Sequence, residues 1–134
     1  VQKRGSVETA YFSVTGTDDE VVPFVSENNW RTNAFFCAWT AYQTMNGMEV
    51  SSRPDFSKDA TFGIALKDRE VISTNKRVTM EAGVLYKGNI PLIKVVAVND
   101  YGHWNFKPDA RLMWDFMKQF SRDPQTKKLV YNKR

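Results

Sequence analysis

Cysteine and histidine are nearly absent from this sequence, which holds one residue of each. A lone cysteine excludes a disulfide within the chain. One cysteine and one histidine also fall short of the three or four ligands that a zinc site requires. We therefore expect no metal site and no cofactor. Cys37 lies in an apolar stretch, so we expect it to be a small buried residue rather than a reactive thiol.

Long hydrophobic runs are also missing. No apolar segment approaches the roughly 18 to 20 residues that span a bilayer. Residues 1–5, VQKRG, lack the apolar segment of a signal peptide. The composition is nevertheless that of a folded protein, because 42% of the residues are hydrophobic and 25% are charged. We expect residues 1–134 to form part of a single domain that does not enter a membrane.

Charge of one sign is in only small excess, with 19 Lys and Arg against 15 Asp and Glu and a net charge of +4. The basic residues are scattered along the chain. Their densest group lies at the C-terminal end: Lys127, Lys128, Lys133 and Arg134. A short basic end is more often solvated than bound to phosphates, so we expect no nucleic-acid partner.

The first half of the sequence reads as a strand, a loop and a helix. Residues 9–15 are rich in β-branched and aromatic types, and residues 16–20 end this strand with turn formers. Ser26 is a candidate helix N-cap, and residues 46–47, Asn-Gly, supply a stop. A helical stripe of apolar residues lies between them: Trp30, Ala34, Cys37, Ala38, Ala41 and Met45.

The second half predicts a hairpin followed by a helix. Residues 48–77 read as a linker, within which 68–76 form a loop or a short strand. Residues 77–86 and 91–99 carry β-forming side chains on either side of a Gly-Asn turn. The second arm is almost continuously apolar, as in a strand buried on both faces. A helix is expected over 108–122, with an apolar stripe of Leu112, Met113, Phe116, Met117 and Phe120. The predicted order is β-α-linker-β-β-α, an α/β fold.

Two polar side chains follow predicted strands, and both are candidates for catalysis. His103, the only histidine, comes after the apolar second arm, and Asp19 comes after the first strand. Either residue alone is more often structural, as a loop histidine or a turn-forming acid. Together they suit each other, because a carboxylate fixes the tautomer of a histidine that acts as a general base. We therefore expect the two loops to meet at one edge of a sheet.

The two loops resemble those of α/β-hydrolases. Residues 16–23, GTDDEVVP, are similar to the G-T-x-D-x-x-V-P loop, in which the acid three residues after the glycine belongs to the catalytic triad. This selects Asp19 over Asp18. Residues 102–104, GHW, are similar to the loop that carries the triad histidine. The order Asp then His also follows the family. The hairpin and last helix are similar to the polyhydroxybutyrate depolymerase and feruloyl esterase branch.

The sequence departs from this family in one respect. The G-x-S-x-G nucleophile elbow occurs nowhere, and none of the serines is flanked by two glycines. The resemblance therefore implies the C-terminal portion of an α/β-hydrolase fold, with the nucleophile half absent. It also implies that the chain alone is inactive. We expect it to need a partner, either the missing N-terminal half or a second copy of the chain.

The resemblance implies a serine carboxylic ester hydrolase that needs no cofactor. An upstream serine would attack the ester, His103 would carry its proton and Asp19 would orient the ring. Feruloyl or acetyl esters of plant polysaccharide are the implied substrates, and a secreted or periplasmic location is implied as well. We expect Trp104 and Phe24 to contact the substrate, the alternative for both being packing in the core.

Two other functions stay open on the sequence alone. One is a non-catalytic α+β binding module, which the absence of a nucleophile favours. The other is a prolyl-peptidase-like serine peptidase. In that family the interval from acid to histidine is usually short, whereas here it is 84 residues, so we prefer the esterase.

Overall fold

The computed structural model describes residues 8–74, 77–103 and 106–133. Their element order is β1 (Tyr11–Gly16), α1 (Ala34–Met45), β2 (Lys67–Ser73), β3 (Thr79–Lys87), β4 (Ile90–Val98), α2 (Pro108–Met117), β5 (Phe120–Arg122) and β6 (Leu129–Tyr131). The fold is mixed α/β. Four strands form one sheet in the order β1-β4-β3-β2, and β5 pairs with β6 in a separate small sheet.

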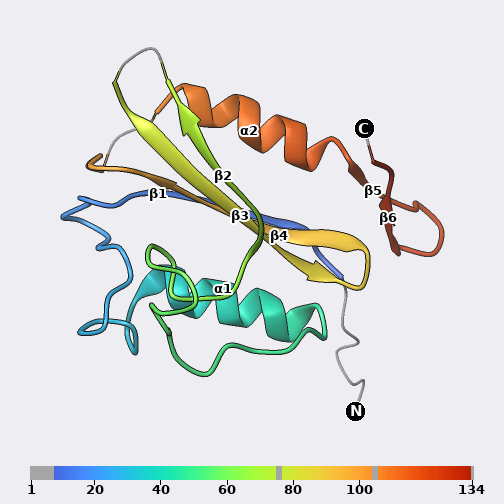
Figure 1. The fold of residues 1–134 in the computed structure, drawn as a ribbon. Helices are drawn as coiled ribbons and strands as arrows, with labels where there is room; N and C mark the ends of the chain where they lie inside the picture. Colours follow the sequence, from blue (N-terminus) through green and yellow to red (C-terminus); the bar gives the residue numbers. More distant parts are fainter. Residues whose placement is uncertain (1–7, 75–76, 104–105, 134) are drawn as a thin grey trace.

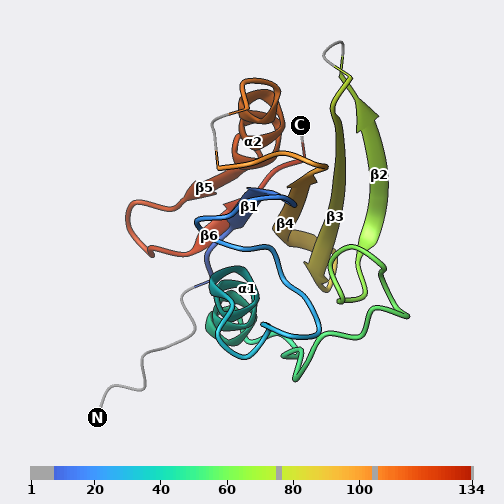
Figure 2. The same ribbon diagram turned by 90° about the vertical axis from the view of Figure 1, so that its left-hand side faces the viewer.

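The sheet lies between the two helices, α1 on one face and α2 on the other (Figures 1 and 2). β1 pairs parallel with β4, whereas β2, β3 and β4 pair antiparallel. One apolar cluster joins α1 and its following loop to the sheet, with Trp39 and Phe62 almost fully buried. The other lies on the α2 side and includes Met80 and Phe106. β4 is buried on both faces, as its apolar sequence predicts.

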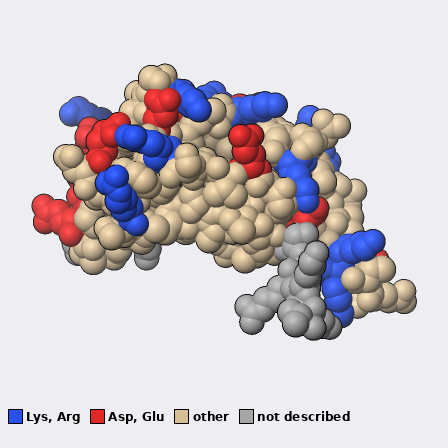
Figure 3. Space-filling model, turned by 90° about the horizontal axis from the view of Figure 1, so that it is seen from below, with Lys and Arg blue, Asp and Glu red and all other residues tan. Residues whose placement is uncertain are grey.

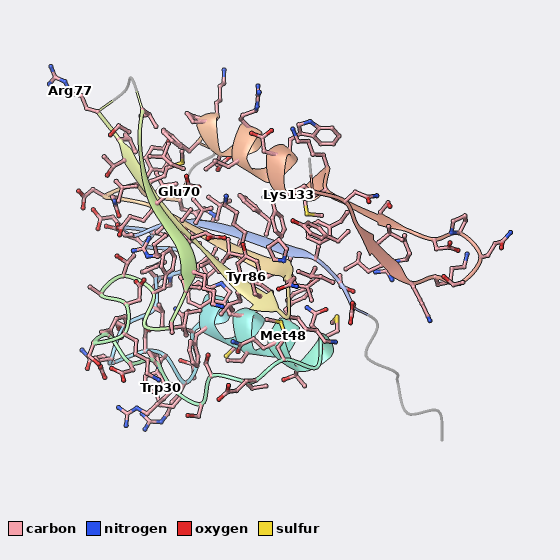
Figure 4. All side chains as sticks on the ribbon, turned by 45° about the vertical axis from the view of Figure 1, so that its right-hand side comes forward. Trp30, Met48, Glu70, Arg77, Tyr86 and Lys133 are labelled. Carbon is pink, nitrogen blue, oxygen red and sulfur yellow. The ribbon has the colours of Figure 1, made fainter. Side chains whose placement is uncertain are left out.

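The predicted hairpin is confirmed as β3 and β4. Lys87 pairs with Ile90 across a two-residue turn, and Gly88 adopts a φ of 59° that favours glycine. The short strand left open within the linker is confirmed, because residues 67–73 form β2 at the outer edge of the sheet, although the predicted order β-α-linker-β-β-α does not include it. Its sequence, KDREVIS, is mostly charged, and exposure at an edge removes the apolar alternation that reveals a strand. Arg77 points outward at the end where β2 connects to β3, whereas Glu70 and Tyr86 lie farther along these two strands (Figure 4).

The first helix starts later than predicted. Asn33, not Ser26, is its N-cap, and Asn33 Oδ1 accepts from Phe36 N–H at 2.9 Å. Ser26 instead belongs to a turn, in which its own N–H donates to Asn29 Oδ1. The helix ends at Met45, and Gly47 follows with a φ of 66°, as the Asn-Gly stop predicts.

The predicted apolar stripe of α1 was wrong, because Ala34, Cys37, Ala41 and Met45 are exposed. The helix buries Phe36, Trp39 and Gln43 instead. Large rings remove more apolar surface from water than alanine does, so they determine which face packs. Trp39 Nε1–H also donates to Ser13 Oγ at 3.1 Å. The expectation that Cys37 is buried is corrected with the rest of the stripe.

The last helix is shorter than predicted. α2 ends at Met117 rather than Arg122, and Phe120 to Arg122 form β5. Leu112 and Phe116 pack against the sheet, whereas Met113 and Met117 are exposed. Among the described residues, no helix is both long and apolar enough to cross a membrane.

Candidate active site

The candidate site forms where β1 and β4 end side by side. The two strands are parallel, and their register pairs Gly16, the last residue of β1, with Val98, the last residue of β4. The loops that follow the two strands therefore lie side by side at the carboxyl ends of these strands. In α/β sheets ligands and catalytic groups gather at the carboxyl ends of the strands.

Backbone hydrogen bonds join the two loops directly. Thr17 N–H donates to Val98 O, and Asp18 N–H donates to Tyr101 O, both at 3.0 Å. In return, Asp100 N–H donates to Thr17 Oγ1 at 2.8 Å. These bonds fix the position of one loop relative to the other over 83 positions of sequence.

Gly16 permits this close approach. A Cβ at position 16 would lie 2.1 Å from Tyr101 O and 2.7 Å from Gly102 O, so no larger residue fits without moving the histidine loop. The glycine of the GTDDEVVP segment is thus required by the contact between the loops.

The structure brings Asp19 and His103 together. His103 Nδ1–H donates to Asp19 Oδ2 at 2.7 Å. The other carboxylate oxygen, Oδ1, accepts from Val21 N–H and Val22 N–H at 2.8 Å each. Three donors thus hold one carboxylate, and its orientation toward the imidazole is fixed.

The same contacts keep Asp19 ionised. Burial raises the pKa of this carboxyl, but the hydrogen bonds from Val22 N–H, His103 and Val21 N–H outweigh burial and hold the pKa below its ordinary value of 3.8. Asp18, the neighbouring acid, is exposed.

The geometry also assigns the two nitrogens of the imidazole. Nδ1 carries the proton that Asp19 accepts, so the neutral ring has its lone pair on Nε2. The Asp19 side chain is 6% exposed, whereas that of His103 is 54% exposed. A buried, oriented carboxylate behind an accessible imidazole is the arrangement of a general base.

This pair borders a hollow of about 430 Å³. β1, β4, the two loops and the start of α2 supply most of its lining. The lining residues are Val14, Thr15, Gly16, Asp19, Val22, Phe35, Val98, Tyr101, Gly102, His103, Phe106 and Asp109. Neither serine nor cysteine occurs in this set. The described lining therefore holds the Asp19–His103 pair without a serine or cysteine beside it.

Two further hollows lie away from the histidine. One of about 540 Å³ is formed by the loop after α1 and the β3–β4 turn, and one of about 340 Å³ lies between the sheet and the end of α2. Neither is lined by a histidine or a cysteine. In the described part of the chain no group of three potential metal ligands gathers. We therefore assign the site by its chemistry and not by the size of the hollow.

The predicted substrate contacts have different outcomes. Trp104 lies outside the described residues. Phe24 packs edge-on against Trp39 and Phe62 in the apolar cluster and does not line the hollow. A substrate contact of Phe24 stays a prediction that would need movement of this ring.

The sequence reasoning missed Asp109 and three aromatic residues of the hollow, Phe35, Tyr101 and Phe106. An available signal was the acid directly after Pro108, in the first turn of a helix that follows the histidine loop. The aromatic residues gave no such signal, because they belong to different segments that only the fold brings together.

Comparison with known proteins yields no relative. No protein-family model matches the chain, and neither a curated protein nor a solved structure is similar to it.

Proposed function

We propose that this chain carries the acid and base of a serine-type carboxylic ester hydrolase whose nucleophile lies outside these 134 residues. The observation that supports it is the 2.7 Å bond from His103 Nδ1 to Asp19 Oδ2, at a pocket that the imidazole faces. The α/β-hydrolase resemblance supplies the reaction class, and this chain supplies a fitting pair of residues.

In the proposed reaction, a serine from the missing part attacks the ester carbonyl, and His103 Nε2 takes its proton. Asp19 stabilises the resulting imidazolium and keeps Nε2 directed at the pocket. The imidazolium then returns the proton to the leaving alcohol, and water releases the acyl group by the same route. A secreted or periplasmic enzyme of this kind needs no cofactor.

The open side of the sheet supports a partner that brings the nucleophile. β1 pairs with β4 on one side only, and Val14, Thr15 and Gly16 of this strand line the hollow. A neighbouring strand paired there would end close to His103. We therefore propose that the partner is the missing N-terminal part of the protein or a second copy of the chain.

Labelling with a fluorophosphonate tests the proposal. The probe is applied to this chain and to a longer form that includes the upstream sequence, and peptide mapping locates the label. We expect an upstream serine to react, with a rate about 10⁴-fold lower in Asp19→Asn and reduced at least as much in His103→Ala. Asp18→Asn is the matched control and keeps the wild-type rate.

Three outcomes would overturn this proposal. Labelling within the 134 residues would mean that the nucleophile is here. A labelled serine whose rate does not depend on His103 would remove the histidine from the reaction. Absence of labelling in a folded longer form would favour the non-catalytic binding module. The absence of serine and cysteine from the described lining supports that alternative.

A further inference from the structure

Asp109 is a carboxylate that the proposed mechanism does not use. It lies in the first turn of α2, is half-buried and lines the hollow that holds Asp19 and His103. In the described part of the chain its side chain makes no hydrogen bond and no ion pair. Burial raises the pKa of this carboxyl, and no contact offsets the effect. Its place in the first turn of α2 suits the helix dipole, and its carboxylate has no side-chain partner among the described residues.

Aromatic rings surround the same space. Phe35, Tyr101 and Phe106 all line the hollow, and the rings of Tyr101 and Phe106 meet edge-on with centroids 5.0 Å apart. The faces of aromatic rings attract cations through their quadrupole, most strongly where water is excluded. A carboxylate beside several rings is therefore suited to a positively charged group.

The charge of the lining has one sign. It contains the carboxylates of Asp19 and Asp109 and neither lysine nor arginine. Asp19 is already bound by three donors, so it has little capacity for a further partner. Asp109 is thus the group available to an incoming donor, and an anionic group would meet unfavourable electrostatics.

We propose that this pocket binds an ammonium-type cation of the substrate, with Asp109 as its counter-ion, and that it rejects anionic substrates. The inference rests on the proposed ester hydrolase and narrows its substrate to esters with a cationic group near the ester bond. Such a substrate differs in charge from the feruloyl and acetyl esters that the family resemblance implies. Asp109 is a specificity-determining residue in this proposal and takes no part in proton transfer.

A charge series of one ring system tests the proposal by binding alone, without hydrolysis. Benzylamine, which is protonated near neutral pH, benzyl alcohol and benzoate are titrated into the 134-residue chain. The NMR resonances of the His103 ring report occupancy of the pocket. We expect benzylamine to bind about threefold or more tightly than benzyl alcohol, and benzoate to bind most weakly.

Three variants separate the effect of the Asp109 carboxylate from the effect of the net negative charge near the site. Asp109→Asn should abolish the preference for benzylamine, whereas Asp109→Glu should retain it. Asp18→Asn removes an equal charge from an exposed neighbour of the site, outside the lining, and should behave as wild type. An unchanged amide spectrum away from the pocket shows that each variant is folded.

Equal binding of the amine and the alcohol would overturn the cation pocket, as would a preference that survives in Asp109→Asn. The two proposals fail separately. If an upstream serine is labelled but benzylamine is not preferred, the hydrolase proposal stands and the cation-binding proposal fails. A cation preference without labelling would leave a cation-binding pocket on a non-catalytic module.

Discussion

At the scale of single residues, Asp19 has two kinds of partner, backbone and side chain, whose effects differ. The backbone N–H groups of Val21 and Val22 hold one oxygen and build the local turn, whereas His103 binds the other oxygen from a distant loop. The first contacts are local and explain why an acid is common in such a loop. The second is not local, and it joins the carboxylate to the imidazole of the histidine loop.

The lowered pKa of Asp19 makes a contribution to stability that depends on pH. Because the folded-state pKa lies below 3.8, the folded state favours the ionised form. The contribution is complete well above pH 3.8 and is lost as the pH falls through the folded-state pKa. We expect Asp19→Asn to unfold more easily than wild type near neutral pH, with the difference shrinking in acid. Urea unfolding at a series of pH values measures it, and a difference that grows in acid would contradict the sign.

A substitution of Gly16 should affect both stability and the position of the histidine loop. Gly16→Ala places a methyl group against Tyr101 O and Gly102 O, so the histidine loop must move. We expect a loss of about 1 to 3 kcal/mol in the free energy of unfolding. The His103 ring resonances should shift as well, because the loop carries the ring.

Gly88→Ala is the comparison for this variant. Gly88 has a φ of 59° in the β3–β4 turn, but nothing lies within 4 Å of an added Cβ. Its strain should cost about 1 kcal/mol and leave His103 unmoved. Equal effects of the two variants on the His103 resonances would mean that close packing at Gly16 does not position the loop.

At the scale of elements, the sequence predicted strands and loops better than it predicted helix faces. β3 and β4 were found because β-forming residue types and a Gly-Asn turn are local signals. The buried face of α1 was missed because Ala34, Cys37 and Ala41 repeat at helical spacing as regularly as the larger rings do. Choosing between two such faces requires knowledge of the surface that the helix packs on.

In the candidate site, too, the residues with local sequence signals were predicted and those brought together by packing were not. Asp19 and His103 were found because both follow strands and resemble a known pair of loops. Asp109 and the rings of the hollow were missed, because their meeting depends on how α1 and α2 pack around β1. Local sequence holds no record of that arrangement.

Arg69 joins three elements by one guanidinium group. It donates to Asp59 at 2.7 Å, to Glu81 at 2.8 Å and to Ala82 O at 3.1 Å, and it lies over the Phe62 ring. Removing one partner of an ion pair costs most where the remaining charge is shielded from water, and the side chains of Asp59 and Glu81 are 7% and 19% exposed. This contact ties the loop after α1 to β2 and β3.

We expect Arg69→Ala to lower the free energy of unfolding by about 2 kcal/mol, because two shielded carboxylates would lose their partner. Arg53 offers a matched control. It pairs with Glu27 at 3.8 Å, and both side chains are more than half exposed. Arg53→Ala should change the free energy by less than about 0.5 kcal/mol. Chemical denaturation measures both, and equal losses would show that the Arg69 cluster is only a surface contact.

At the scale of the whole molecule, the two edges of the sheet differ. β2 carries the charged residues of KDREVIS, which protect an edge against pairing, whereas β1, YFSVTG, has no charge. β1 is also flanked by a helix on each side of the sheet, as an interior strand would be (Figure 2).

The outer face of α1, next to β1, is also uncharged. The helix has no charged residue along its length, and its outward residues include exposed Ala34, Ala41 and Met45. Seen from the α1 side, charged side chains of both signs lie to the left of, above and to the right of a broad uncharged area (Figure 3). An uncharged edge strand beside an uncharged helix face is typical of a surface that another segment covers.

Hydrogen exchange can separate the two edges. In a dilute solution of the chain, the amides of β3 and β4 should exchange slowest, because each of these strands has a neighbour on both sides. The amides of β1 that face outward should exchange faster. In a longer form, or at a concentration where two copies associate, the outward amides of β1 should become protected and those of β2 should not. Protection that appears on β2 instead would place the partner at the charged edge, away from the pocket, where it could not bring a nucleophile to His103.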